Sequence, residues 1–293
     1  MGDVMVGLIG GTGLGEALTR GTGGKAVEVE TPFGKPSAPI LVTEVEGQRV
    51  AILTRHGPGH RFNPSEVPYR ANIFALKQLG VTHILASGAT GSLQDSIAPR
   101  HLVICDQVID RTTRPGRTFF DAMAVHVGFA QPFCPSLRGL LVECGIGAET
   151  TVHTRGTYVC MEGPQFSTRA ESLLHRQWGA DLIGMTCMPE AKLAREAEIC
   201  YALIAIPTDY DCWRPHEPGL SPDAVLESIR ANVEAGAANA VALVKAAVPR
   251  IAEAAGPECG CRSALAQAIW TDRQAIDPAV ARRLEPLVGK YLK

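Results

Sequence analysis

The stretch that decides the fold is LIGMTCMPEAKLAREAEICYALIAIPTDYDCW, which runs from Leu182 to Trp213. Its first five residues form a short apolar run that ends in the hydroxyl of Thr186, as expected for a buried strand. Pro189 suits the first position of a following helix, because its fixed φ is helical and its missing N–H loses no hydrogen bond there. Apolar residues then recur at helical spacing, which predicts one buried face and an outward face with Lys192, Arg195 and Glu196.

A second strand follows that helix. Residues 200–206 are continuously apolar, which is typical of a strand buried on both faces of a largely parallel sheet. Asp209 and Asp211 come just after it. Ligands of open α/β sheets bind beyond the carboxyl ends of the strands. The two carboxylates are therefore either turn residues or groups that face a pocket beside Met185 and Thr186.

The length and the net charge limit the number of domains and the kinds of partner that we expect. The 293 residues suffice for one large or two small domains, and the net charge of −2 gives no reason to expect nucleic acid or an anionic membrane as a partner. No apolar stretch approaches the length of a membrane span, and no basic, cleavable leader is present at the N-terminus. We therefore expect a cytoplasmic protein with neither a nucleic-acid nor a membrane partner.

The nine cysteines are scattered, and most lie in apolar runs, as buried thiols of a reducing compartment would. Cys259 and Cys261 form the one close pair in the sequence. The pair lacks the second Cys or His pair that a zinc site needs, so we expect no metal site. A redox role or a strained disulfide at this pair stays open.

The N-terminus predicts an anion-binding loop. Residues 4–9 indicate a strand that runs into the glycine-rich residues 10–15, where backbone N–H groups can converge and Thr12 can donate its hydroxyl. Glu16 stands where a dinucleotide fingerprint needs glycine. The loop therefore indicates either a phosphate site or a tight turn.

Two more strands end in groups that suit phosphate. Residues 50–53 lead into Arg55 and His56, and the guanidinium of arginine is a planar fork for phosphate oxygens. A solvated basic loop is the alternative. Residues 81–86 lead into a second glycine-rich loop, in which the backbone at Gly88 and Ala89 can approach a ligand closely.

Helices are predicted between and after these strands. They cover residues 65–79, a segment opening at 163–171, and a long helix from Ser221 to Pro249. Residues 253–262 look like a linker, followed by a C-terminal helical appendage. We therefore expect an α/β domain over residues 1–250 and an attached segment over residues 251–293.

Taken together, the polar residues at the strand ends indicate a function more narrowly than any one of them does alone. A hydroxyl, a guanidinium, an imidazole and backbone amides make a cradle for phosphate, whereas a carboxylate suits a ring nitrogen. The set describes a site that holds inorganic phosphate against a glycosidic bond, with a carboxylic acid that helps a heterocycle to leave.

These residues resemble the purine nucleoside phosphorylase family, in the branch that acts on 5′-methylthioadenosine. The motifs run in the family's order over residues 4–250: Gly10-Gly11-Thr12-Gly13-Leu14, Thr54-Arg55-His56-Gly57, Glu162-Gly163-Pro164-Gln165-Phe166, Met185-Thr186, Pro189-Glu190 and Thr208-Asp209-Tyr210-Asp211-Cys212-Trp213. The resemblance implies a three-layer α/β/α domain with a mixed central sheet. It also implies a homotrimer with sites near the subunit boundaries, although a hexamer stays open.

The resemblance also implies a role for each site residue. Phosphate would meet Thr12, Arg55, His56, Gly88, Ala89 and Thr186. Asp209 would be catalytic, and the nucleoside would contact Phe166, Met185, Asp209, Asp211, Val225 and, from a neighbouring subunit, His126.

The implied reaction is phosphorolysis of S-methyl-5′-thioadenosine to adenine and S-methyl-5-thioribose 1-phosphate. Inorganic phosphate would be the co-substrate, with no cofactor. A phosphorylase for 6-oxopurine nucleosides or methylthioinosine is the nearest alternative. That branch has Glu after the stacking Phe and Asn in place of Asp209, whereas Ser167 follows Phe166 here. A purine-binding relative without turnover is a further alternative, but it would not need a phosphate clamp.

Overall fold

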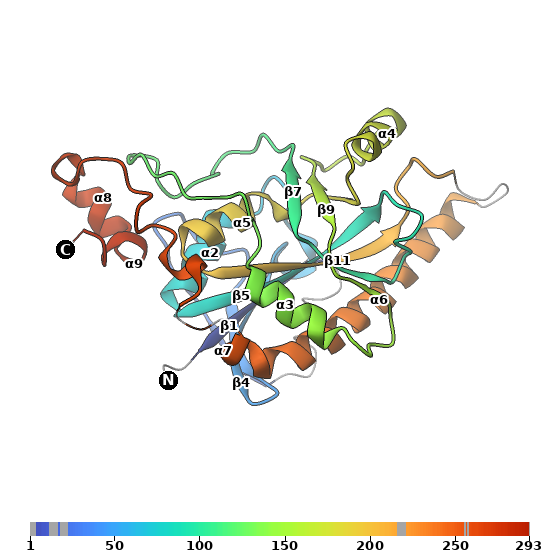
Figure 1. Ribbon diagram of the computed structural model, residues 1–293, viewed down its shortest axis with the longest axis horizontal. Coiled ribbons are helices and arrows are strands. Elements are labelled where there is room, and N and C mark those ends of the chain that lie inside the picture. Colours follow the sequence, from blue (N-terminus) through green and yellow to red (C-terminus); the bar gives the residue numbers. More distant parts are fainter. Residues whose placement is uncertain are drawn as a thin grey trace.

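A mixed β-sheet with helices on both faces forms the protein (Figure 1), as the computed structural model shows for residues 4–11, 17, 23–215, 221–254, 256 and 258–292. The expected three-layer α/β/α architecture is therefore confirmed. The strands are β1 (Met5–Gly10), β2 (Lys25–Val27), β3 (Ile40–Val45), β4 (Gln48–Thr54), β5 (Val81–Ser92), β6 (Leu102–Ile104), β7 (Gln107–Asp110), β8 (Val152–His153), β9 (Thr157–Cys160), β10 (Leu182–Gly184) and β11 (Cys200–Asp209).

Strand β5 is the centre of the sheet. The main path has the order β2-β3-β4-β1-β5-β10-β9-β7, and β11 branches from β5 toward β6 and β8. Strands β4, β1, β5 and β11 run parallel, whereas β10 is antiparallel to β5. The carboxyl ends of β4, β1, β5 and β11 therefore meet at one edge of the sheet, where the polar residues were expected.

Alternating side chains of the central strands fill two cores. In β1, Met5 and Ile9 join one core while Val6 and Leu8 join the other, as the period of two along a strand requires. Helices α2 (Tyr69–Gln78) and α5 (Cys187–Glu196) cover the first face. Helices α3 (Pro135–Cys144), α6 (Pro222–Ala247) and α7 (Ile251–Ala254) cover the second (Figure 1).

Two central strands are longer than the sequence predicts. The expected glycine-rich loop after residue 86 is wrong, because β5 continues to Ser92. Its extension is paired on both sides: Gly91 lies opposite Asp209 of β11 and opposite Ile183 of β10. Strand β11 likewise extends through Pro207, with a shift of register before Asp209. Asp209 is therefore the last residue of a strand and not part of the following loop.

Helix α5 confirms the expected strand–helix–strand unit, but one side chain is misassigned. Glu196 was expected to face outward and is instead buried, where its carboxylate accepts hydrogen bonds from Thr118 Oγ1 and Phe119 N, each at 2.8 Å. Burial raises the pKa of Glu196 to about 7, although these hydrogen bonds oppose the shift. A segment distant in sequence supplies the partners, so helical periodicity alone could not place this residue.

The remaining helices are short, apart from α4 (Arg169–Gln177). Thr168 and Glu171 form a capping box at its start. The C-terminal segment holds α8 (Pro278–Arg283) and α9 (Glu285–Val288), at the left of Figure 1. Single 3-10 turns occur at Pro58–His60, Val248–Arg250, Gly260–Ser263 and Arg273–Ala275. None of the helices in the described part of the chain combines the length and apolar character that crossing a membrane requires.

Candidate active site

Arg55 follows the last residue of β4 and is fully buried. Its guanidinium binds the carboxylate of Glu190 through two hydrogen bonds, Nε to Oε2 at 2.7 Å and Nη2 to Oε1 at 2.8 Å. Nη1 donates to the carbonyl oxygen of Ser87 at 2.7 Å. Burial opposes the charge, but the Glu190 carboxylate outweighs it, so the pKa of Arg55 is raised. Among the described residues, Glu190 and Ser87 take up three of the five guanidinium N–H groups.

Two glycines, Gly11 and Gly88, lie next to the groups around this arginine. A Cβ added at Gly11 would lie 2.9 Å from Arg55 Nη1 and 3.0 Å from Ser87 O. The residue after β1 therefore packs directly against the Arg55 guanidinium and the Ser87 carbonyl. A Cβ at Gly88 would lie 3.5 Å from Thr186 Oγ1, in ordinary contact. The structure therefore brings Arg55, Gly88 and Thr186 together. Thr12, the next residue in the sequence after Gly11, lies outside the described residues.

Thr186 stands at the N-cap of α5. Its side chain makes no capping hydrogen bond within the helix, and its residue is half-buried. A half-buried hydroxyl that is not used for capping is available to donate to an anion, whereas the backbone at the start of α5 adds little, because Met188 N–H donates to Cys160 Sγ and Pro189 has no N–H. Thr186 therefore adds a donor to the edge that Arg55 and Gly88 form.

His56 is buried beside Arg55 and is neutral at physiological pH. Burial, and then the positive charge of Arg55, lower the pKa of His56 to about 4. Nδ1 lies 2.8 Å from the carbonyl oxygen of Phe62, and since a carbonyl can only accept, Nδ1 carries the proton. Nε2 is left as an acceptor. The ring stacks on His60, with centroids 4.1 Å apart.

The two aspartates lie over Gly91 of β5. A Cβ added there would be 3.0 Å from Asp211 Cβ and 3.4 Å from Asp209 Oδ1, so only glycine leaves room for both. Asp211 has a positive φ of 49° and accepts a hydrogen bond from Ser172 Oγ on α4. The Trp213 indole donates to Ser92 O at 2.8 Å, which fixes the loop on the end of β5. The acidic pair is thus built into the sheet edge.

Met185 and the loop after β9 form the next part of the edge. Gly163 has a φ of 68°, and a Cβ there would lie 2.6 Å from Met185 Sδ, so this loop packs on the methionine. Phe166, three residues further, is 86% exposed. Val225 is half-buried in the first turn of α6. The structure therefore brings Met185 to the loop before Phe166 but leaves the aromatic ring open to solvent.

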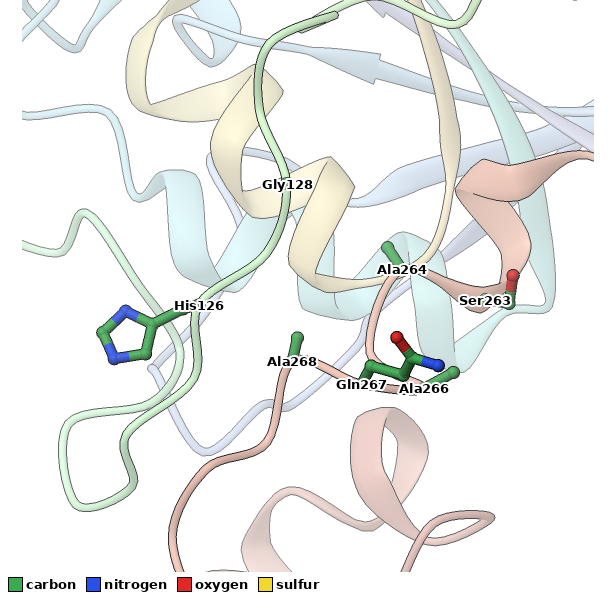
Figure 2. A pocket seen from close by; sticks show the side chains of 7 residues that line it. All are labelled: His126, Gly128, Ser263, Ala264, Ala266, Gln267 and Ala268. Atoms are coloured by element: carbon green, nitrogen blue, oxygen red, sulfur yellow. The ribbon is translucent and has the colours of Figure 1, made fainter.

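His126 lies apart from these groups. It is exposed, its ring meets Trp270 at a centroid distance of 4.6 Å, and its N–H donates to Ala268 O at 2.9 Å. It borders a cavity of about 370 Å³ formed with the C-terminal segment, and in Figure 2 its ring points away from Gln267. The helices of that segment lie at the left of Figure 1, whereas β11 ends toward the right. His126 therefore does not join the edge within one chain.

Two polar residues that support the site, the buried Glu190 and the half-buried Glu162, have no clear signal in the sequence. Glu190 holds Arg55 and also accepts from Tyr201 Oη at 2.8 Å, although it was expected only to favour the helix terminus. Glu162 accepts from Ser65 Oγ and from the Thr113 N–H, both at 2.6 Å, and so joins three loops. The partners lie far apart in sequence, and so no local pattern reports these pairs.

Two buried hydroxyls on β5 also escaped prediction. Ser87 Oγ and Thr90 Oγ1 find no hydrogen-bond partner in the described structure. They flank Gly88 and Ala89, the backbone expected to meet phosphate. Buried polar atoms are rarely left without a partner, so their presence here indicates that a ligand or water completes the edge.

The arranged groups suit one kind of chemistry. A buried cation, a half-buried hydroxyl and a neutral imidazole acceptor lie at one end, which suits an anion that also carries a proton. Carboxylates lie at the other end, across Gly88 to Gly91 of β5. The edge can therefore hold an oxyanion beside a group that gains a proton as it leaves.

Comparisons with known proteins identify the family of the chain. The family model of the phosphorylase superfamily matches residues 5–249. The chain is 47% identical to the S-methyl-5′-thioadenosine phosphorylase of Geobacter sulfurreducens, over 99% of this chain and 100% of that protein. It is 45% identical to the protein of the same name from Gloeobacter violaceus, over 98% and 95%.

Solved structures share the fold of this chain over nearly its whole length. A methylthioadenosine phosphorylase sourced from an antarctic soil metagenomic library has a TM-score of 0.88 and 46% identity, covering 97% of this chain and 99% of that one. The methylthioadenosine phosphorylase from Schistosoma mansoni in complex with adenine has a TM-score of 0.83 and 35% identity, covering 91% and 99%.

Proposed function

The chain belongs to the phosphorylase superfamily, and from that premise we propose that it is a pentosyltransferase for S-methyl-5′-thioadenosine. Phosphorolysis would release adenine and S-methyl-5-thioribose 1-phosphate, a step of purine and methionine salvage. The relatives named for this activity match nearly the whole chain at 45–47% identity. One observation in the structure carries the proposal: β5 joins the cationic end at Arg55 to the carboxylate of Asp209 through Gly88 and Gly91.

Phosphate occupies the cationic end in this proposal. The Arg55 guanidinium, the Thr186 hydroxyl and the Gly88-Ala89 backbone donate to its oxygens, and Thr12 adds a hydroxyl. Because His56 is a neutral acceptor at Nε2, it receives the hydrogen of a P–OH group and does not supply charge. Phosphate binding therefore needs a protonated oxygen on the side of His56.

The nucleoside lies along the other end. An oxygen of phosphate forms a bond to C1′ as the bond from C1′ to N9 breaks, and the electron pair of that bond leaves with adenine. Asp209 gives or shares a proton at purine N7, which makes adenine a better leaving group. The phosphate anion stabilises the cationic ribosyl group that forms between them. Met185 supports the ribose, Phe166 stacks on the purine, and Asp211 adds a polar contact.

Selectivity for adenine rests on the same carboxylates. A 6-amino group donates hydrogen bonds and a 6-oxo group accepts them, so an acidic acceptor favours adenine. A mismatch would leave a buried polar group unpaired, which discriminates strongly. At the 5′ end, Val225 begins an apolar helix face that suits a methylthio group.

We further propose a homotrimer whose neighbouring subunits close the 5′ end through His126. Four large apolar side chains on and beside α4 are exposed by 42–86%: Phe166, Leu173, Leu174 and Trp178. Helix α4 projects from the body of the subunit in Figure 1. A subunit packed there would cover these side chains, including the proposed purine-stacking ring. Sedimentation analysis tests this assembly: a trimer or a hexamer built from trimers agrees with it, and a monomer or a dimer would contradict it.

The proposal also covers the extent of the catalytic domain and the location of the protein in the cell. Residues 1–250 form the catalytic unit, which the end of the family match at residue 249 supports. We also propose that the protein works in the cytoplasm, which its nine cysteines support because none of them forms a disulfide. Fractionation of cells with an antibody to the protein tests this location.

One assay tests the activity. Purified protein is given methylthioadenosine, methylthioinosine, adenosine or inosine, each with and without phosphate. We expect phosphate-dependent release of adenine from methylthioadenosine and much slower reaction of both 6-oxopurines. Faster phosphorolysis of methylthioinosine, or release of adenine without phosphate, would reject the proposal.

A further inference from the structure

Four cysteines that are distant in sequence gather at one point of the fold. Cys134 is the N-cap of α3, Cys200 is the first residue of β11, and Cys259 and Cys261 flank Gly260 after α7. Their four sulfur atoms all lie within 4.8 Å of one another. The pair at Cys259 and Cys261 appeared in the sequence to lack partners for zinc, and the fold supplies the second pair.

The sulfur spacing fits a metal better than a disulfide. Cys259 Sγ lies 3.6 Å from Cys134 Sγ and 3.6 Å from Cys200 Sγ. Zinc binds thiolate at about 2.3 Å, so the edge of a regular tetrahedron of four sulfurs measures about 3.8 Å. The sulfurs of a disulfide are only about 2.05 Å apart, and all nine cysteines are free. Two of the separations are close to that edge and none exceeds 4.8 Å, so the four thiols are near enough to share one ion.

The surroundings suit a closed structural site. Cys134, Cys200 and Cys261 are buried and Cys259 is half-buried, which leaves no open position for a substrate. Cys134 begins a ten-residue helix, whose N-terminal dipole favours a thiolate. Soft thiolates in a tetrahedral set select zinc over the harder divalent cations.

We propose that Cys134, Cys200, Cys259 and Cys261 bind one structural zinc ion. Each coordinating thiol gives up its proton to solvent, and the ion links the start of β11, the start of α3 and the segment that follows α7. Zinc would thus fasten the C-terminal segment to the central sheet. Glu198, two residues before Cys200, reinforces the same junction by accepting from the Leu265 N–H at 3.0 Å and from Tyr291 Oη at 2.6 Å. The site is separate from the proposed active site and makes no contact with substrate.

Metal analysis of the intact protein tests the proposal. We expect one zinc ion per chain in protein purified with a non-thiol reductant and without chelator. After removal of zinc, added Co²⁺ should restore one equivalent and give the intense visible absorption of tetrahedral cobalt bound by sulfur. Removal of the metal should lower Tm, and added Zn²⁺ should restore it.

Variants separate this cluster from the other cysteines. The double variant Cys259→Ser, Cys261→Ser should contain no zinc and should have a lower Tm than the wild type. Cys144 lies outside the cluster, so Cys144→Ser should have the zinc content and the Tm of the wild type. Wild-type protein that stays metal-free when Zn²⁺ is added would overturn the proposal, as would disulfides among the four cysteines under reducing purification or stoichiometric iron in place of zinc. The cobalt spectrum of the wild-type protein decides the question even if the serine variants fail to fold.

Discussion

Asp209 is the residue on which the proposed chemistry depends most. Its position after a buried apolar run was visible in the sequence, and the structure adds that its carboxylate lies over Gly91. We predict that Asp209→Asn lowers kcat on methylthioadenosine by roughly 10²–10⁴-fold, because an amide cannot supply a proton. The variant should also lose preference for 6-aminopurines, since an amide can donate to a 6-oxo group.

Steady-state kinetics on methylthioadenosine and methylthioinosine check this prediction. Asp95→Asn is the matched control, because Asp95 is an exposed carboxylate whose side chain is 71% accessible and pairs with Arg214 at 3.6 Å. It should behave as the wild type. Unchanged rates of Asp209→Asn on both nucleosides would remove this residue from the mechanism.

His56 makes stability depend on pH in a defined direction. Its pKa is lowered to about 4 by burial and by Arg55, from an ordinary value near 6.5, so the unfolded chain binds this proton more readily than the folded protein. The stability that neutral His56 contributes is present above about pH 6.5 and is lost as the pH falls toward 4. His56→Gln should therefore reduce the loss of unfolding free energy between pH 7 and pH 5, by on the order of 1–2 kcal/mol.

Urea unfolding at the two pH values measures this difference. His126→Gln serves as the control, because His126 is an exposed histidine, whereas His56 is buried. Equal losses in wild-type protein and His56→Gln would mean that His56 is not held neutral.

At the scale of elements, the end of β4 is joined to α5 by the ion pair of Arg55 with Glu190. Both side chains are at most 1% accessible, so removal of one partner leaves the other charge buried and unpaired. We predict that Glu190→Gln lowers the free energy of unfolding by about 3–5 kcal/mol. Phosphate should then raise Tm more in the variant than in the wild type, because the anion replaces the missing negative charge beside Arg55.

Thermal unfolding at increasing phosphate concentration checks this expectation. Glu196→Gln is the matched control on the same helix: it is also buried, but it binds Thr118 and Phe119 and does not contact Arg55. Its response to phosphate should equal that of the wild type. If Glu190→Gln also responds like the wild type, Arg55 does not face phosphate.

The sequence predicted the elements better than it predicted their ends or their partners. Apolar runs and helical spacing located β1, β10, α5, β11 and α6, because burial on a sheet imposes those patterns. The length of β5 was missed, since its last residues are held by strands β10 and β11 that follow about 90 or more residues later. For the same reason the partners of Glu190 and Glu196 were missed: a buried carboxylate is matched by contacts across the fold, which no local spacing records.

At the scale of the whole molecule, the chain folds the polar ends of β4, β5, β10 and β11 into one edge but leaves His126 away from it. The sequence suggested the edge for β4, β5 and β11, because parallel strands end together. Strand β10 runs antiparallel to β5 and brings Thr186 back beside Gly88. It could not show that the four cysteines meet or which surfaces a second subunit covers. The exposed Phe166 and the distant His126 are both explained if each site is completed by a neighbouring subunit.

Mixed oligomers test that explanation. His126→Ala and Asp209→Asn should each be weakly active alone, since every site in either homo-oligomer lacks one group. Random co-assembly in equal amounts should restore about one quarter of wild-type activity, because a site works when an intact Asp209 and an intact His126 come from adjacent subunits. The two variants mixed after folding, without subunit exchange, are the control and should stay as weakly active as each variant alone. If tagged mixed oligomers recover no activity, or if His126→Ala alone is fully active, the 5′ end of the site is closed within a single chain.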